Sequence, residues 1–437
     1  VNELSYIILE AERSVNMVSD DIVVRVSDNS PEDYLTLACE VARDGGGKLK
    51  FVGDKTIISN LMLDGMPLEK ARCYGIQGCT SPIVEGYSYN LPGGIISLPG
   101  ILELALNNGI HRLTGLRLGL ETGDARNFSS YEEVVEAFKK QVEYVVPFLH
   151  QIKNADKEVY ATYMPSPFQS CMVAPCIESG KDVISGGTKP YYFFAMSTAG
   201  APNVGDSLAA IKKIVFEDEM VTMGELMDAI EHNWEGYEQM QKLFIRAPKF
   251  GNDDPYVDGI VNSVLSFVSD EICKYEGYNG AHSQIAAAAV TANVGLGMVC
   301  GALPDGRCAG EPISEGGISP AQGRNESGIT ATMMSIAHLD HTKMRHGSVL
   351  NIRMNPDSVD TSAKIEKFKS LIKSFCSEGG FLVQFNIVST KTLRDAQVNP
   401  EAHRDLVVRV ATYAAYFVEL GKELQDDIIH RLEMQEC

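Results

Sequence analysis

The sequence predicts an α/β fold, because short runs rich in β-branched residues alternate with stretches of helical periodicity. The runs DIVVRVS (21–27) and LKFVG (49–53) are typical of strands. The stretches PEDYLTLACEVARDG (31–45) and KTIISNLMLDGMPLEKARCYG (55–75) carry apolar residues at helical spacing. Strands that alternate with helices in this way predict a sheet covered by helices.

The same criteria extend this pattern along the chain. Further strands are predicted at EVYATYM (158–164), SVLNIRMNP (348–356) and FLVQFNIVS (381–389). Long amphipathic helices are predicted at 130–155 and 223–245. Both ends of the chain are predicted to be helical.

Composition excludes several classes of protein. The formal charge of −20, from 38 Lys+Arg against 58 Asp+Glu, disfavours nucleic-acid binding. The sequence has no apolar run of eighteen residues and does not begin like a signal peptide, so neither a membrane span nor secretion is expected and a cytoplasmic location is predicted. The ten cysteines show no framework spacing, which favours reduced thiols over disulfides.

Cys79 is the first candidate for chemistry. It lies in YGIQGCTSP (74–82), where Gly78 and the Thr-Ser-Pro segment predict a tight loop that projects the sulfur. A projected thiol is suited to act as a nucleophile, a metal ligand or a radical carrier. An inert, buried cysteine is the plainer alternative.

Two later segments also stand out. GALPDGRCAGEPISEGGISPAQGRNESG (301–328) is long and rich in glycine, which predicts a loop docked closely against other backbone and marks the best boundary in the chain. Near the end, RDLVVRV (404–410) predicts a strand or helix that leads to a turn at 411–413, followed by an amphipathic helix.

In this order, these segments resemble the glycyl radical enzymes of the pyruvate formate-lyase superfamily. That family carries a Gly-Cys loop, here Gly78-Cys79, and a Pro-Asp-Gly-Arg-x-x-Gly-Glu-Pro segment, here Pro304 to Pro312. Its C-terminal Arg-Val-x-Gly-Tyr motif is matched by Arg409 to Tyr413, with Thr412 at the position of the radical glycine. The resemblance covers essentially the whole chain.

The resemblance implies part of a ten-stranded β/α barrel, with the cysteine loop and the C-terminal loop meeting in the interior. It also implies a catalytic region at 1–300, which lacks part of the family's N-terminal length and so does not close a barrel alone, and a glycyl radical domain at 301–437. Cys79 would carry a thiyl radical that attacks a small organic substrate under anaerobic conditions. A separate S-adenosylmethionine and iron-sulfur activase would install the radical, no cofactor or metal would stay bound, and a homodimer is expected.

Thr412 is the main departure from the family pattern. A backbone carbon radical prefers planarity, which a β-branched side chain opposes, so we expect the chain to be inactive as it stands. The alternative is a non-catalytic homologue or an interaction partner of an intact enzyme. A third possibility is that a small glycyl radical protein supplies the glycine in trans.

The residues after Cys79 narrow the reaction. The family's acyltransferases use two adjacent cysteines, but Thr80 follows Cys79 here. Its dehydratases and amine lyases usually place a glutamate two residues after the cysteine as general acid and base, where this chain has Ser81, and Glu85 lies too far along the loop. A decarboxylase is therefore slightly favoured.

The remaining candidates are expected to be structural. His338 and His341, with His346, lack a third ligand at diagnostic spacing for a metal. Cys171 and Cys176 are not spaced as a redox pair. Trp234 is expected to anchor the core.

Overall fold

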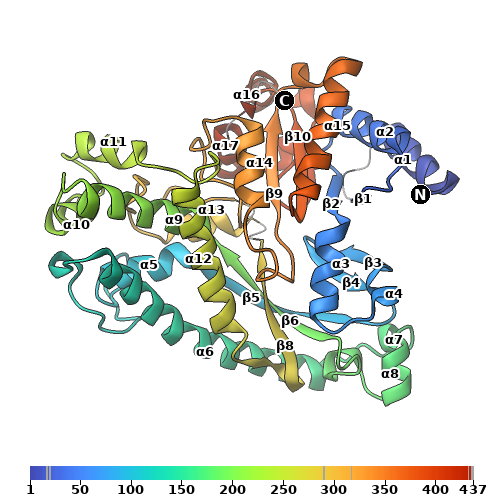
Figure 1. Ribbon diagram of the computed structural model, residues 1–437, viewed down its shortest axis with the longest axis horizontal. Coiled ribbons are helices and arrows are strands. Elements are labelled where there is room, and N and C mark those ends of the chain that lie inside the picture. Colours follow the sequence, from blue (N-terminus) through green and yellow to red (C-terminus); the bar gives the residue numbers. More distant parts are fainter. Residues whose placement is uncertain (16–17, 19–20, 289–290, 316, 432, 435–437) are drawn as a thin grey trace.

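The computed structural model describes residues 1–15, 18, 21–288, 291–315, 317–431 and 433–434. Over these residues the chain folds into a mixed α/β structure with two larger sheets and two short hairpins (Figure 1). This confirms the predicted fold class. Figure 1 shows the five-stranded sheet near α2 (Glu32–Arg43) and α15 (Ser362–Ser377), whereas the four-stranded sheet lies beside α6 (Tyr131–Tyr163) and α12 (Pro255–Ile272).

The five-stranded sheet joins strands that lie far apart in the sequence. β1 is parallel to β2, β10 is antiparallel to β2, and β9 is parallel to both β10 and β13. The predicted regions 1–300 and 301–437 therefore share one sheet. In order, its strands are β1 (Ile22–Val26), β2 (Leu49–Gly53), β10 (Leu382–Ile387), β9 (Leu350–Met354) and β13 (Glu433–Met434).

The four-stranded sheet is parallel except for its short edge strand β7. An isolated parallel bridge between Ala287 and Ser348 connects β8 to the segment that enters β9, so the two sheets adjoin. The strands of the four-stranded sheet are, in order, β5 (Tyr89–Ser97), β6 (Tyr192–Ala199), β8 (Ala281–Ala287) and β7 (Glu276–Gly277). The hairpins are β3 (Tyr74–Gln77) with β4 (Ser81–Val84) and β11 (Val407–Arg409) with β12 (Ala414–Tyr416).

Helices fill the connections between these strands. The remaining helices are α1 (Glu3–Val15), α3 (Asp54–Leu63), α4 (Leu68–Ala71), α5 (Leu98–Leu106), α7 (Pro167–Ser170), α8 (Ala174–Ser179), α9 (Ala201–Ala210), α10 (Met223–Glu231), α11 (Glu238–Arg246), α13 (Ala292–Met298), α14 (Ile329–Ala337), α16 (Thr390–Val398) and α17 (Lys422–His430). None of the described helices is both long and apolar enough to cross a bilayer.

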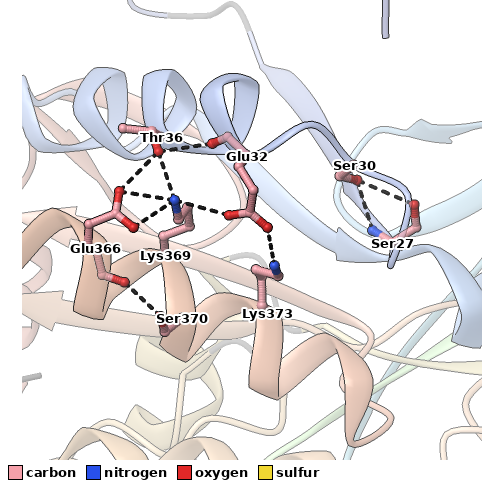
Figure 2. Close-up of polar contacts among 8 residues, drawn as sticks. All are labelled: Ser27, Ser30, Glu32, Thr36, Glu366, Lys369, Ser370 and Lys373. Carbon is pink, nitrogen blue, oxygen red and sulfur yellow. Dashed lines mark hydrogen bonds and ion pairs between the residues drawn. The ribbon is translucent and has the colours of Figure 1, made fainter.

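A polar clamp joins α2 to α15 across the sequence (Figure 2). The Lys369 ammonium on α15 lies 3.1 Å from a Glu32 carboxylate oxygen, donates to the Thr36 hydroxyl at 3.0 Å, and lies 2.8 Å from a carboxylate oxygen of Glu366. Lys373 pairs with the other oxygen of Glu32. Edge-to-face contacts among Phe51 of β2, Phe368 of α15 and Phe385 of β10 fill the space between this helix and the five-stranded sheet.

Some predicted elements differ from the observed ones. The helical stretch predicted at 55–75 divides into α3 and α4, and its last residues enter β3. The strand predicted at 158–164 is wrong: these residues form the last turns of α6, because no helix-breaking residue interrupts the chain between Pro147 and the Met164-Pro165 step. Short runs rich in β-branched and aromatic residues do not distinguish strand from helix by periodicity.

The single helix predicted at 223–245 is also wrong. It breaks into α10 and α11, because Asn233, Trp234 and Gly236 all take positive φ. This turn buries the Trp234 indole, whose Nε1 donates to the Arg307 carbonyl at 3.2 Å, so a tertiary contact overrides helical propensity. The expectation that Trp234 anchors the core is confirmed.

Close packing at the end of β2 predicts a stability effect. A β-carbon at Gly53 would overlap the carbonyl oxygen of Gly380, whereas one at Gly75 in β3 would meet no atom within 4 Å. We therefore expect Gly53→Ala to lower the free energy of unfolding by about 1–3 kcal/mol, the usual cost of overpacking. Gly75→Ala is the matched control, and urea unfolding measures both. Equal stabilities would contradict the packing described.

Candidate functional site

Cys79 lies in the turn of the β3–β4 hairpin. Gln77 pairs with Ser81 at the end of the ladder, which leaves residues 78–80 to form the turn. Gly78 takes φ +57°, a conformation that glycine adopts without steric cost. Cys79 is a free thiol with intermediate exposure. The predicted tight loop that projects the sulfur is confirmed.

The Cys79 turn borders a cavity of about 360 Å³ between the hairpin and the four-stranded sheet. Asn90 and Ser197 contribute polar groups to its wall, and Gly93 and Gly94 of β5 also line it. Among the described residues that line it there is no carboxylate. This volume suits a small organic molecule.

His346 is the other titratable side chain in the wall of this cavity. Burial lowers the pKa of its imidazole to about 4, so the ring is neutral near pH 7. Its backbone carbonyl accepts a hydrogen bond from the Thr80 hydroxyl at 3.3 Å. The next residue, Gly347, has φ +107° and packs so closely on Thr80 that a β-carbon there would overlap its carbonyl oxygen. The 346–347 segment therefore supports the cysteine turn from behind.

Thr412 lies in the turn of the second hairpin, between β11 and β12. The Val410 amide donates to the Tyr413 carbonyl at 2.9 Å, which closes the turn around Ala411 and Thr412. Thr412 is only 3% exposed. Within the described part of the chain, its buried hydroxyl has no hydrogen-bond partner. The predicted turn at 411–413 is confirmed.

A chain of charged side chains connects the two turns through two buried cations and the partly exposed carboxylate of Asp21. The Lys50 ammonium donates to the Gly78 carbonyl at 2.7 Å and lies 2.7 Å from one oxygen of the Asp21 carboxylate. The other Asp21 oxygen accepts from the Arg409 guanidinium. The same guanidinium donates to the Thr412 carbonyl at 2.8 Å. The cysteine turn and the C-terminal turn thus share one interior network.

The two cations in this network are deeply buried. Lys50 and Arg409 are each only 1% exposed, and Arg409 also donates from Nε to the Gln384 amide oxygen. Lys50 and Gln384 lie opposite one another on β2 and β10. Burial lowers the pKa of Lys50, and the adjacent Arg409 charge adds to this, while Asp21 opposes it. Asp21 therefore balances charge that the interior would otherwise leave uncompensated.

The 301–328 segment is docked, as its glycines predict. The Arg307 guanidinium donates to the carbonyls of Gly301 and Gly297, both at 2.7 Å. A β-carbon at Gly306 would overlap the Ile245 side chain. None of the described residues of this segment lines the Cys79 cavity.

The remaining candidates lie outside the Cys79 cavity. The His341 ring contacts the Ser348 hydroxyl and the Ile336 carbonyl, and the described residues contain no cluster of three or more metal-binding side chains. Cys171 is exposed, whereas Cys176 is buried, and both are free thiols. Glu85 is exposed after β4 and does not line the Cys79 cavity.

The residues that hold the two turns were not among those predicted from the sequence. Lys50 and Asp21 were not identified, and His346 was considered only as a metal ligand. The sequence contains one indication of this network. Lys50 is the second residue of LKFVG, a strand whose other residues are apolar or glycine, so its charge needs a partner. The identity of that partner, and the presence of His346 in the cavity, depend on tertiary contacts.

Comparisons with known proteins agree with this geometry. A family model described as "Pyruvate formate lyase-like" matches residues 1–297, and one described as "Glycine radical" matches residues 314–418. The chain is 36% identical to trans-4-hydroxy-L-proline dehydratase of Clostridioides difficile over 99% of its length, which covers 55% of that relative. It is 33% identical to (2S)-3-sulfopropanediol dehydratase of Klebsiella oxytoca, over 99% of this chain and 53% of that relative.

Solved structures give the same result. The glycerol-bound form of the B12-independent glycerol dehydratase from Clostridium butyricum superposes with a TM-score of 0.95 at 35% identity, over 100% of this chain and 55% of that one. The hydroxyproline dehydratase from Clostridioides difficile, with its substrate bound, gives the same values. The chain thus spans about half the length of the relatives it matches.

Close packing behind the cysteine turn predicts the effect of one substitution. Gly347→Ala would force the Thr80 backbone to move in addition to straining φ. Gly45→Ala is the control, because Gly45 has φ +109° but a β-carbon there would meet no atom within 4 Å. We expect Gly347→Ala to cost about 1–3 kcal/mol more than the control in urea unfolding. Hydrogen exchange at residues 78–81 should also quicken; unchanged exchange there would contradict the contact.

The buried histidines predict a pH dependence. Burial lowers the pKa of both His341 and His346 from 6.5 to about 4, so between these values the unfolded chain binds protons that the folded chain does not. Their effect is absent above pH 6.5, and stability falls as the pH drops from 6.5 to 4. Unfolding at several pH values should show a shallower fall for His346→Gln than for the parent chain. Parallel curves would argue against a neutral buried imidazole.

Proposed function

The chain belongs to the pyruvate formate lyase-like glycyl radical enzymes, and we propose that it is the cysteine-bearing part of a radical lyase in which Thr412 blocks formation of the radical. The observation that carries the proposal is the network through Asp21, which holds the Cys79 turn and the Thr412 turn in one interior. Those are the two turns between which the family's chemistry passes.

Cys79 is the proposed thiyl carrier. A thiyl at its sulfur takes a hydrogen atom from a substrate C–H bond, which forms the S–H bond and leaves a carbon radical. When that carbon bears a hydroxyl, loss of its proton and departure of a neighbouring substituent as an anion give a carbonyl-stabilised radical. This product radical recovers the hydrogen atom from Cys79, so no net oxidant is consumed.

The cavity supplies the proposed proton acceptor. The described residues that line it include no carboxylate, and Ser81 occupies the position where the family's dehydratases usually carry glutamate. His346 lines the same cavity and is, with Cys79, one of the two titratable side chains among its described lining residues. Its imidazole is neutral near pH 7 and so has a free lone pair, although burial, which lowers its pKa to about 4, also makes it a weak base. We assign it the role that the glutamate fills elsewhere.

The proposed substrate is a small molecule with a leaving group next to a carbon that bears a hydroxyl or an amino group. Relatives at 33–36% identity are named for dehydration of hydroxyproline and sulfopropanediol and for release of sulfite from isethionate. The 4-hydroxyphenylacetate decarboxylase of Clostridium scatologenes is less similar, at 29%. Cleavage of a carbon–heteroatom bond is therefore favoured over decarboxylation.

The second candidate is a non-catalytic homologue that binds an intact relative, and Thr412 favours it. Its β-carbon crowds the planar arrangement that a backbone radical prefers, and its hydroxyl lies buried without a partner among the described residues. This candidate predicts stable association with an intact glycyl radical enzyme, which co-purification would detect.

Substitution at position 412 tests the proposal. After anaerobic treatment with an S-adenosylmethionine-dependent activase, the parent protein should give no glycyl signal in electron paramagnetic resonance. Thr412→Gly, in the full-length protein, should give one. Thr412→Ala is the matched control, because it removes the hydroxyl and the methyl group but keeps the β-carbon, and it should remain silent.

Turnover completes the test. Thr412→Gly should convert at least one compound among trans-4-hydroxy-L-proline, propane-1,2-diol, glycerol and isethionate. Adding Cys79→Ser should abolish turnover but keep the glycyl signal, because the cysteine acts after the glycine. A silent Thr412→Gly protein that co-purifies with an intact relative would replace the lyase with the second candidate.

A further inference from the structure

A second cavity, of about 530 Å³, lies in the helical layer between α6, α12 and the C-terminal end of α9. Figure 1 shows α12 running between α9 and α6. This cavity shares no lining residue with the one beside Cys79. Its volume falls within the range of small-molecule sites in proteins.

The wall of this helical cavity is apolar and aromatic, with two positive charges. Phe138, Leu208 and Phe267 supply apolar surface. Lys139 and Lys212 are the only charged residues among the described residues of the wall, which include no aspartate or glutamate. In a chain with a formal charge of −20, a wall with two lysines and no carboxylate is unusual.

Both ammonium groups are held over aromatic rings. Lys212 Nζ lies 4.8 Å from the ring centre of Tyr256 and 5.5 Å from that of Tyr131, and Lys139 Nζ lies 5.2 Å from that of Phe267. Lys212 Nζ also lies 3.8 Å from a carboxylate oxygen of Glu217, a residue outside the wall. The charges are thus placed at the cavity but not fully neutralised there.

Lys212 lies on a segment of irregular helix at the edge of this cavity. Residues Ile211–Glu217 continue α9 as a π-helix, which is rare and is frequently found at functional sites. This π-helix carries Lys212. Across the cavity, Gly259 leaves the side of α12 open, because a β-carbon there would meet no atom within 4 Å.

We propose that this helical cavity binds a small organic anion with an aromatic body, such as an aryl carboxylate. One of the two ammonium groups would bind the carboxylate, because Tyr256 and Phe267, over which the two groups lie, are about 16 Å apart along α12. The aromatic side chains would enclose the ring. Burial raises the pKa of the Tyr131 phenol to about 12, so that its hydroxyl stays neutral and does not repel the anion. This site is independent of the chemistry proposed at Cys79.

The test uses 2-naphthoate as the probe, with 2-naphthamide as its neutral counterpart, in isothermal titration. We expect 2-naphthoate to bind and the amide to bind at least about tenfold more weakly. Lys139→Gln with Lys212→Gln should weaken naphthoate binding by about tenfold or more. The matched control is Lys140→Gln with Lys213→Gln, because these neighbouring lysines pair with Glu136 and Asp218 outside the wall. It should bind like the parent.

A second variant tests the position of the site without changing charge. Gly259→Leu should fill the cavity and abolish naphthoate binding, and it should keep the fold because leucine favours a helix more than glycine. Gly295→Leu, at an equally open position on α13, is its control. No binding by the parent, equal binding of acid and amide, or normal binding by Gly259→Leu would each overturn the proposal.

Discussion

One carboxylate, Asp21, holds the candidate site together by serving two buried cations at once. Lys50 and Arg409 are each almost fully excluded from solvent, and each donates to the backbone carbonyl of a different turn. Burying two like charges is costly unless a counter-charge and enough acceptors surround them. The carbonyls of Gly78 and Thr412 are among those acceptors. Moving either turn away would leave a buried cation short of partners, so electrostatics fixes the turns.

The two sheets contribute different parts of the candidate site. The five-stranded sheet supplies Lys50 and Gln384, which lie opposite one another on β2 and β10, whereas Arg409 comes from β11 of the second hairpin. The four-stranded sheet supplies the wall of the Cys79 cavity through β5, β6 and β8. The bridge between Ala287 and Ser348 joins the sheets next to His346 and Gly347, the segment that supports the cysteine turn.

Local signals in the sequence were enough to predict both turns, because Gly78 and the hairpin around Thr412 depend on neighbouring residues. The network between them was not predictable, because its hydrogen bonds join residues that are 28 and 388 positions apart in the sequence. A single sequence, read without an alignment, gives no sign of such distant pairs. Tertiary packing also decided one error in secondary structure, the break between α10 and α11. Trp234 turns the chain to reach Arg307, which no helical periodicity reveals.

The contacts that hold the C-terminal turn do not use the side chain at position 412. Arg409 binds the carbonyl of Thr412, and Val410 and Tyr413 close the turn through backbone atoms, so the anchor makes no use of the threonine side chain. That side chain is buried, and its hydroxyl has no partner among the described residues. A residue without a β-carbon would keep every one of these contacts. The turn is therefore built for its backbone, as expected where the reactive atom of the family is a backbone carbon.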